Sequence, residues 1–228
     1  MKHLLLAGAV ALVSLSGSAN AAAVILGIAQ GGTPGSAADP GPFAGQTVKF
    51  GFDTAVGLSG SYAIFSTPSG TGNSAPPAGS ANGNQYLSVA NPAVSGSAQL
   101  DLDGRYDSVS FYWGSIDEYN QVDIVEFDGT VTEFDGNDLT VFLGQDPSWG
   151  NQSAINSNMR VNFGSGSGIT ELRFHTQNFA FEIDSVAVGN PSVINAVPEP
   201  ATWAMMVGGF GMLGFAARRR SGSRTVLA

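Results

Sequence analysis

The chain has 228 residues, and its 18 acidic residues outnumber nine basic ones, which gives a formal net charge of −9 at neutral pH. An acidic surface repels phosphate groups, which argues against a nucleic-acid-binding protein and against adhesion to anionic lipid. The chain contains no cysteine, which excludes disulfides and thiol catalysis.

The first 21 residues have the order of a secretory signal peptide. A basic start at Lys2 precedes an apolar run from Leu4 to about Leu15, and small residues follow at Ala19 and Ala21. This order is typical of a signal peptide with an A-x-A cleavage site. We therefore expect the Sec machinery to export the chain and signal peptidase to remove residues 1–21.

Residues 22–197 have the length of a single domain of ordinary size. This segment holds four of the basic residues and 17 of the acidic ones, so its net charge is −13. The mature protein is therefore more acidic than the whole chain suggests.

Most of this domain shows the alternation of apolar and polar residues that is typical of half-buried strands. Turns rich in Gly, Ser, Asn and Pro separate about ten such runs, a pattern that predicts an all-β fold and favours a β-sandwich of jelly-roll type. The predicted strands are 47–52, 61–66, 85–90, 99–102, 108–113, 122–127, 139–143, 159–163, 170–175 and 179–188.

Two tracts, 30–42 and 66–84, are rich in Gly, Ser and Pro and poor in residues that pack, which predicts long surface loops. A short motif occurs twice, as Phe127–Gly129 and as Phe134–Gly136. Its simplest interpretation is two turns with the same Asp-Gly chemistry, the first of which closes a tight hairpin.

The segment after residue 108 concentrates aromatic and acidic residues and is the natural place to look for a ligand site. Alternation places Trp113 on the core face and Tyr112 on the opposite face. The polar turn that follows contains Asp117, Glu118 and Tyr119, which together with an outward Tyr112 would suit a sugar: aromatic rings stack on its flat face and carboxylates accept its hydroxyl hydrogens. A solvated loop would have the same composition.

The last predicted strand changes its alternation partway along. Phe181 and Ile183 share one parity, whereas Val186 has the other, so we expect a β-bulge near Asp184 and Ser185. The strand is similar to the last strand of jelly-roll carbohydrate-binding modules. This similarity implies a structural calcium ion at Asp184, although the spacing of the sequence supplies no partner ligands for it. Apart from this calcium ion, no cofactor is expected.

Catalysis has little support in the sequence. His175 is the one histidine of residues 22–197, and it alternates with apolar residues as a solvent-facing strand residue would. No nucleophile elbow, zinc-binding helix motif or phosphate-binding loop is present, so we expect no enzyme activity. The alternative is a glycoside hydrolase with paired carboxylates, drawn from residues 117, 118, 123 and 126.

The end of the chain combines a proline-rich tripeptide, an apolar run and an arginine cluster. The apolar run 201–217 would reach about 25 Å as a helix, just enough to span a bilayer. The positive cluster after it favours the cytoplasmic side and leaves the domain outside. The individual residues are Pro198, Glu199, Pro200, Trp203, Arg218, Arg219 and Arg220.

This order resembles the PEP-CTERM sorting signal of Gram-negative bacteria, in its PEPxxWA variant, over residues 198–224. The resemblance implies that an exosortase cuts near the tripeptide, so that membrane anchoring is transient. The stretch from Phe111 to Val186 also resembles the ectodomain of one group of exosortase-dependent surface proteins. We therefore expect a protein exported across the inner membrane to the cell surface or extracellular matrix, with a structural or adhesive role and exopolysaccharide as a candidate partner.

Overall fold

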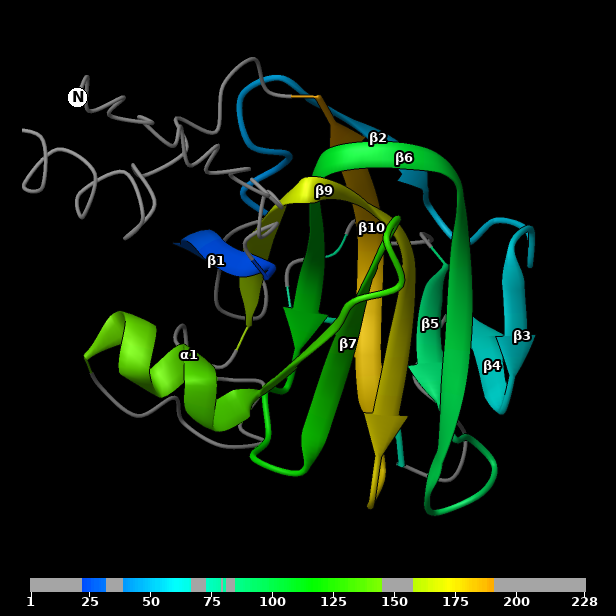
Figure 1. Ribbon diagram of the computed structural model, residues 1–228. Helices are drawn as coiled ribbons and strands as arrows, with labels where there is room; N and C mark the ends of the chain where they lie inside the picture. The colour runs from blue at the N-terminus through cyan, green and yellow to red at the C-terminus, as the bar shows by residue number, and fades with distance from the viewer. Residues whose placement is uncertain are drawn as a thin grey trace, which may run out of the picture.

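The computed structural model describes residues 22–31, 39–66, 73–78, 80, 85–144 and 158–190. These residues form antiparallel strands and one short helix (Figure 1). The elements in chain order are β1 (Val24–Gln30), β2 (Gln46–Phe50), β3 (Leu58–Gly60), β4 (Tyr62–Phe65), β5 (Tyr86–Val89), β6 (Gly96–Gly114), β7 (Asn120–Glu126), β8 (Val131–Asp135), α1 (Gly136–Leu143), β9 (Met159–Thr176) and β10 (Phe181–Gly189).

The strands are hydrogen-bonded into one sheet that bends over itself to make two layers. The two longest strands, β6 and β9, cross the bend at the top of Figure 1, and each contributes one half to each layer. In the first layer, the second half of β6 pairs with β10 and with the first half of β9. In the second layer, the first half of β6 pairs with β3 and with the second half of β9, which also pairs with β7.

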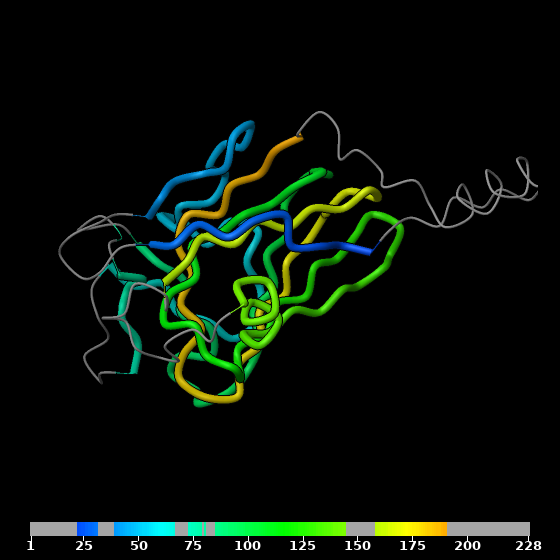
Figure 2. Tube along the Cα trace, turned by 90° about the vertical axis from the view of Figure 1, so that its left-hand side faces the viewer, coloured from blue at the N-terminus to red at the C-terminus, as the bar shows by residue number. Residues whose placement is uncertain are grey.

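Shorter strands complete both layers. β2 and β5 each pair with part of β10, and β4 pairs with β5. β1 runs along the outer side of β9, and Figure 2 shows it in blue beside that strand. The hairpin of β7 and β8 closes the other end of the second layer.

Residues with positive φ angles mark the bend in both long strands. On β6, Asp103 and Gly104 have positive φ angles of 45° and 153°. On β9, the segment Gly164–Gly168 alternates Gly and Ser, and Gly168 has a φ of 80°. Because glycine adopts such angles without strain, these segments can turn without ending the strand. The sequence predicted one strand on each side of each bend, and the structure joins each pair into one strand: 99–102 and 108–113 into β6, 159–163 and 170–175 into β9.

The hydrophobic core lies between the two layers. Phe111 of the first layer meets Phe174 of the second edge to face, with their ring centroids 5.4 Å apart. Phe174 also contacts Phe181 of β10, and Trp113 stacks on Phe181 at 4.6 Å. All four side chains are fully buried. Such aromatic pairs add about 0.5–1.5 kcal/mol each beyond the area that they bury, so they hold the two layers together.

The all-β prediction is confirmed, while the jelly-roll connection order stays a prediction. The predicted strand at 139–143 is wrong, because these residues belong to α1. The Asp135 carboxylate accepts hydrogen bonds from the backbone N–H groups of Asn137 and Asp138, and the Asp138 carboxylate accepts one from the Asp135 backbone N–H. This capping box starts a helix where the sequence suggested a second turn. The first turn is confirmed, because residues 127–130 close the hairpin of β7 and β8.

Beyond the end of β1, the described parts of the two predicted surface loops have no helix or strand, but several of their residues pack against the first layer. In the tract 66–84, Ser74 and Ala78 are buried, and the Ala78 N–H donates to the side chain of Asn158. In the tract 30–42, Asp39 forms an ion pair with the fully buried Arg160. These described residues therefore lie against the outer face of the first layer, where Asn158 and Arg160 hold them by side-chain hydrogen bonds.

The predicted signal peptide (1–21) and the predicted C-terminal membrane helix (201–217) lie outside the described residues. Within the part of the chain that the structure describes, no helix has the length and apolar character needed to cross a membrane.

Candidate functional site

The loop after β6, predicted as a sugar site, is mostly buried. Trp113 lies in the core, as alternation predicted. Tyr112 does point to the opposite face, but it is fully buried as well, because the segment 73–78 covers it and its hydroxyl donates to the Ala78 carbonyl. The prediction of an outward-facing Tyr112 is therefore wrong, since alternation identifies the face of a strand but not what lies over it.

The three other candidate residues of this loop differ in exposure. Asp117 is only 8% exposed, Tyr119 is half-buried, and Glu118 is exposed. The Tyr119 hydroxyl lies 2.7 Å from Asp117 Oδ2 and 3.0 Å from the Phe179 carbonyl oxygen. These contacts fix the hydroxyl end of the Tyr119 side chain within the protein. A ligand-binding role for Asp117, Glu118 and Tyr119 stays a prediction.

A buried carboxyl group that the sequence reading did not single out lies beside this loop. Glu182 of β10 is 3% exposed; the Ala75 N–H donates to its Oε1 at 3.4 Å, and its Oε2 has no hydrogen-bond partner. Burial raises the pKa of Glu182 well above its ordinary value, and burial is also the main cause of the raised pKa values of Asp117 and Tyr119. Burial thus makes the protonated form of each group more favourable than it is in water. Alternation alone would have placed Glu182 on a solvated face.

The β-bulge predicted in β10 is confirmed at Asp184 and Ser185. The register with β6 shifts after Asp184, and Ser185 has a positive φ of 52°. The bulge returns Val186 to the core while Asp184 stays on the outer face, where it is 3% exposed. Burial raises the pKa of Asp184 to about 6; the charge of Asp39 adds to this rise, and the charge of Arg160 opposes it.

A metal site at Asp184 gains no support from the described residues. Among them, no group of three or more His, Cys, Asp or Glu side chains is arranged to hold a metal ion. Arg160 of β9 already supplies a positive charge near Asp184. Calcium at Asp184 stays a prediction that rests on the similarity of the strand alone.

The carboxylates considered for glycoside hydrolysis are held by neighbours. Asp123 accepts a hydrogen bond from the Gln121 side chain and lies 2.9 Å from Nε2 of His175, which is on the exposed face as predicted. Glu126 is 2% exposed and accepts a hydrogen bond from the Ser165 hydroxyl at the bend of β9. These contacts give both residues a role in joining neighbouring strands.

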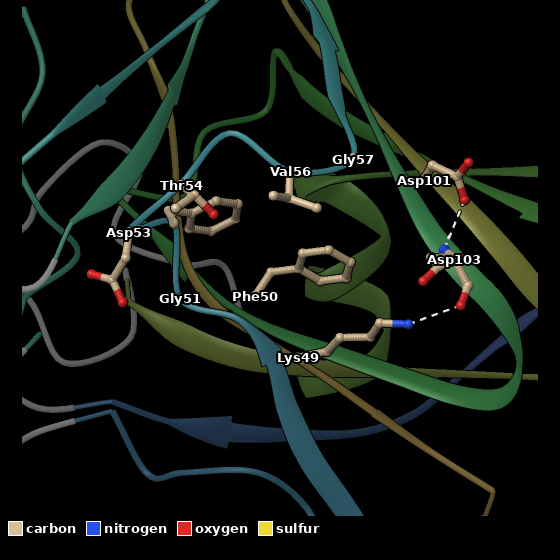
Figure 3. Close-up of a pocket in the computed structure, with 10 residues that line it drawn as sticks. Lys49, Phe50, Gly51, Asp53, Thr54, Val56, Gly57, Asp101 and Asp103 are labelled. Carbon is tan, nitrogen blue, oxygen red and sulfur yellow. Dashed lines mark hydrogen bonds between the residues drawn. The ribbon is translucent and has the colours of Figure 1, made fainter.

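Another concave site lies between the connection of β2 to β3 and the bend of β6. We call it the β2–β6 pocket; it has a volume of about 500 Å³ and is lined by residues 49–54, 56, 57, 101 and 103. In Figure 3, Phe50 and Val56 lie between Asp53 on one side and Asp101 and Asp103 on the other. The pocket therefore has an apolar middle with carboxylates at both ends.

The backbone around the pocket takes conformations that few side chains tolerate. Phe52 has a φ of 60° and Asp103 a φ of 45°, although neither is glycine. Gly57 has a φ of 77°, and a Cβ there would lie 2.7 Å from the Asp101 carbonyl oxygen. Only glycine therefore lets the β2–β3 connection approach β6 so closely. Left-handed angles at non-glycine residues cluster at functional sites, which supports a role for this pocket. Ser115 in the loop after β6 also has a positive φ of 48°, so the angles do not rank the two sites.

Lys49 joins the two walls of the pocket. Its ammonium group donates to the carbonyl oxygens of Leu102 and Asp103 at 2.6 and 2.9 Å and to the Tyr106 hydroxyl at 2.7 Å. The side chains of Asp53, Asp101 and Asp103 are exposed. They accept hydrogen bonds but donate none when ionised, so the pocket suits a ligand that brings hydroxyl or amine donors.

The sequence contained only a weak sign of this pocket. Asp101–Gly104 has an Asp-x-Asp-Gly spacing, which is typical of calcium loops, but the further ligands of such a loop are absent from the sequence. The pocket depends on residues 49–57 and 101–103, which lie far apart along the chain. No local pattern could have predicted that they meet.

The comparison with known families concerns the end of the chain. The family model described as the PEP-CTERM protein-sorting motif matches residues 196–220. This match confirms the sorting signal predicted from the tripeptide at 198–200, Trp203 and the arginine cluster at 218–220, all of which lie outside the described residues. No curated protein matches the chain. The motif supports export, processing by an exosortase, and sorting to the cell surface or the extracellular space.

Proposed function

We propose that this chain, which carries an exosortase sorting motif, is a structural or adhesive protein of the cell surface or extracellular matrix that binds exopolysaccharide in the β2–β6 pocket. The sorting motif supports the location. The single observation that carries the binding role is the combination of an aromatic ring and three exposed carboxylates around one pocket.

The chemistry of the pocket suits a sugar ring. Phe50 is half-buried and Val56 is 67% exposed, so both can cover the apolar carbon face of a pyranose. Asp53, Asp101 and Asp103 can accept hydrogen bonds from hydroxyl groups at the edge of the ring. The net charge of −13 on residues 22–197 disfavours an acidic polymer and favours a neutral or basic one.

The route to the surface follows from the order of the two end signals. The Sec machinery and signal peptidase act first, and the apolar C-terminal run then holds the chain in the inner membrane of a Gram-negative bacterium. An exosortase cuts near the tripeptide and ends this anchoring. The domain that is left is a non-catalytic β-sandwich of jelly-roll type.

Affinity gel electrophoresis in the exopolysaccharide of the producing cells tests this proposal. The gel should retard the wild-type protein, and Phe50→Leu should lose most of the retardation because it removes the ring while keeping an apolar side chain. Phe142→Leu is the matched control: this side chain is 48% exposed on α1, outside the pocket.

Melting temperatures of both variants are measured alongside, so that loss of binding is separated from loss of folding. No retardation of the wild type would contradict the proposed binding role. Loss of retardation in Tyr119→Phe, with normal retardation in Phe50→Leu, would place the ligand at the loop after β6 instead.

A further inference from the structure

We infer that the β2–β6 pocket selects a saccharide that carries free amino groups, such as a polymer of de-N-acetylated hexosamine. This inference rests on the proposed binding of polysaccharide and specifies the chemical class of the ligand. It is carried by the hydrogen-bonding capacity and the charge of the residues that line the pocket.

Lys49 is the one positively charged residue that lines the pocket, and its ammonium group has no N–H donor left for a ligand. An ammonium group has three N–H donors, and those of Lys49 are taken by two carbonyl oxygens and the Tyr106 hydroxyl. The polar side chains that remain are the carboxylates of Asp53, Asp101 and Asp103 and the hydroxyl of Thr54. The pocket therefore offers mainly acceptors, and a ligand must supply most of the donors.

The charge of the pocket favours a cationic donor over a neutral one. Three carboxylates and one ammonium group line it, and Lys49 is held against the β6 wall by its three hydrogen bonds. Near a protein surface, one ion pair at contact distance changes affinity by about fivefold or more at low salt. A protonated amine gains this attraction at each carboxylate, whereas the acetamide of an N-acetylated sugar does not.

The apolar middle of the pocket argues for a sugar rather than a small amine alone. Figure 3 shows the Phe50 ring and the Val56 side chain between the carboxylates. The face of a pyranose ring covers such a surface, while amino and hydroxyl groups at its edge reach the carboxylates on both sides. A volume of about 500 Å³ is large enough for a ligand of this size.

The test compares two oligosaccharides of equal length that differ only in acetylation, a glucosamine hexamer and an N-acetylglucosamine hexamer. Their affinities for the protein recovered from the producing cells are measured by calorimetry at about pH 6, where amines are protonated. EDTA is present to remove metal ions. We expect the glucosamine hexamer to bind at least about tenfold tighter at low salt, and added salt to reduce most of this difference.

Two conservative variants test whether Asp101 and Asp103 cause the preference for the glucosamine hexamer. Asp101→Asn keeps the side-chain oxygen that accepts a hydrogen bond from the Asp103 N–H, and asparagine tolerates the left-handed backbone at Asp103. Each of Asp101→Asn and Asp103→Asn should therefore fold normally and weaken binding of the glucosamine hexamer about fivefold. Glu133→Gln is the matched control: it removes one exposed charge on β8, and its effect should stay below about twofold.

Equal affinity for the two hexamers, or an equal loss in Glu133→Gln, would overturn the selection for amines. The proposed function would survive that result if the polysaccharide of the producing cells still retards the protein. Failure to bind either hexamer, together with no retardation by that polysaccharide, would contradict both the selection for amines and the proposed binding of polysaccharide.

Discussion

Replacing Asp39 with alanine should destabilise the protein, because the change leaves a buried arginine without its main partner. The Arg160 side chain is fully buried, and its guanidinium group donates two hydrogen bonds to the Asp39 carboxylate. Removing one partner of a buried ion pair costs about 3–5 kcal/mol. Since the Asp39 side chain keeps 17% of its surface exposed, we expect a loss near the lower end, about 3 kcal/mol.

The pKa of Asp184 provides a second measurement that tests this prediction. The ion pair of Asp39 and Arg160 lies close to Asp184, and the negative charge of Asp39 helps to raise the pKa of Asp184 to about 6. Without Asp39, this repulsion disappears while the attraction of Arg160 remains. The pKa of Asp184 should therefore fall below about 6, which an NMR titration of its carboxyl carbon would measure.

Urea unfolding measures the coupling energy between Asp39 and Arg160. It compares four proteins: the wild type, Asp39→Ala, Arg160→Met and the double variant. Methionine in place of the buried charge should recover much of the loss in the double variant, so the coupling energy should exceed about 1 kcal/mol. Glu118→Ala, an exposed site, should stay within about 0.5 kcal/mol of the wild type. A loss of less than about 0.5 kcal/mol in Asp39→Ala, or additive effects, would refute the ion-pair argument.

Two further predictions concern the two faces of the first layer. The pKa of Asp184 rises in the folded state from 3.8 to about 6. Protonation of Asp184 therefore contributes roughly 3 kcal/mol to the free energy of unfolding. This contribution is present below about pH 4 and is lost as the pH rises through 6. Asp184→Asn should therefore raise the unfolding free energy at neutral pH and leave it little changed at about pH 3.5; an equal effect at both pH values in urea unfolding would contradict this. Trp113→Ala should cost about 3–5 kcal/mol, because the buried ring stacks on Phe181. Trp113→Phe should cost less than half of that, because it keeps a ring and removes an indole N–H that has no partner; equal melting temperatures for the two variants would refute the stacking argument.

Alternation along single strands predicted which side chains share a face. It placed Trp113 in the core and required a bulge near Asp184, and the structure confirms both. Alternation could not predict that Tyr112 and Glu182 are buried, because the segment that covers them comes from residues 73–78. A glycine-rich tract looks the same in sequence whether it is solvated or packed against polar side chains.

The sequence did not predict α1 or the β2–β6 pocket, and the reasons differ. α1 depends on a capping box at Asp135 and Asp138, and its apolar residues 139–143 are too few to show a helical period. The β2–β6 pocket depends on a contact between distant segments that only the bend of β6 brings together. By contrast, the sorting signal was predictable in full, since its parts follow one another directly along the chain.

Intact-mass analysis of the protein recovered from the producing cells tests the sorting assignment most directly. The released species should run from about Ala22 to near Val197, and its mass would also reveal any group that the exosortase reaction attaches. A variant with alanine at residues 198–200 should stay in the membrane fraction and keep its arginine tail. Release of that variant with the same C-terminus as the wild type, or a wild-type mass that still includes residues 201–228, would contradict processing at the sorting motif.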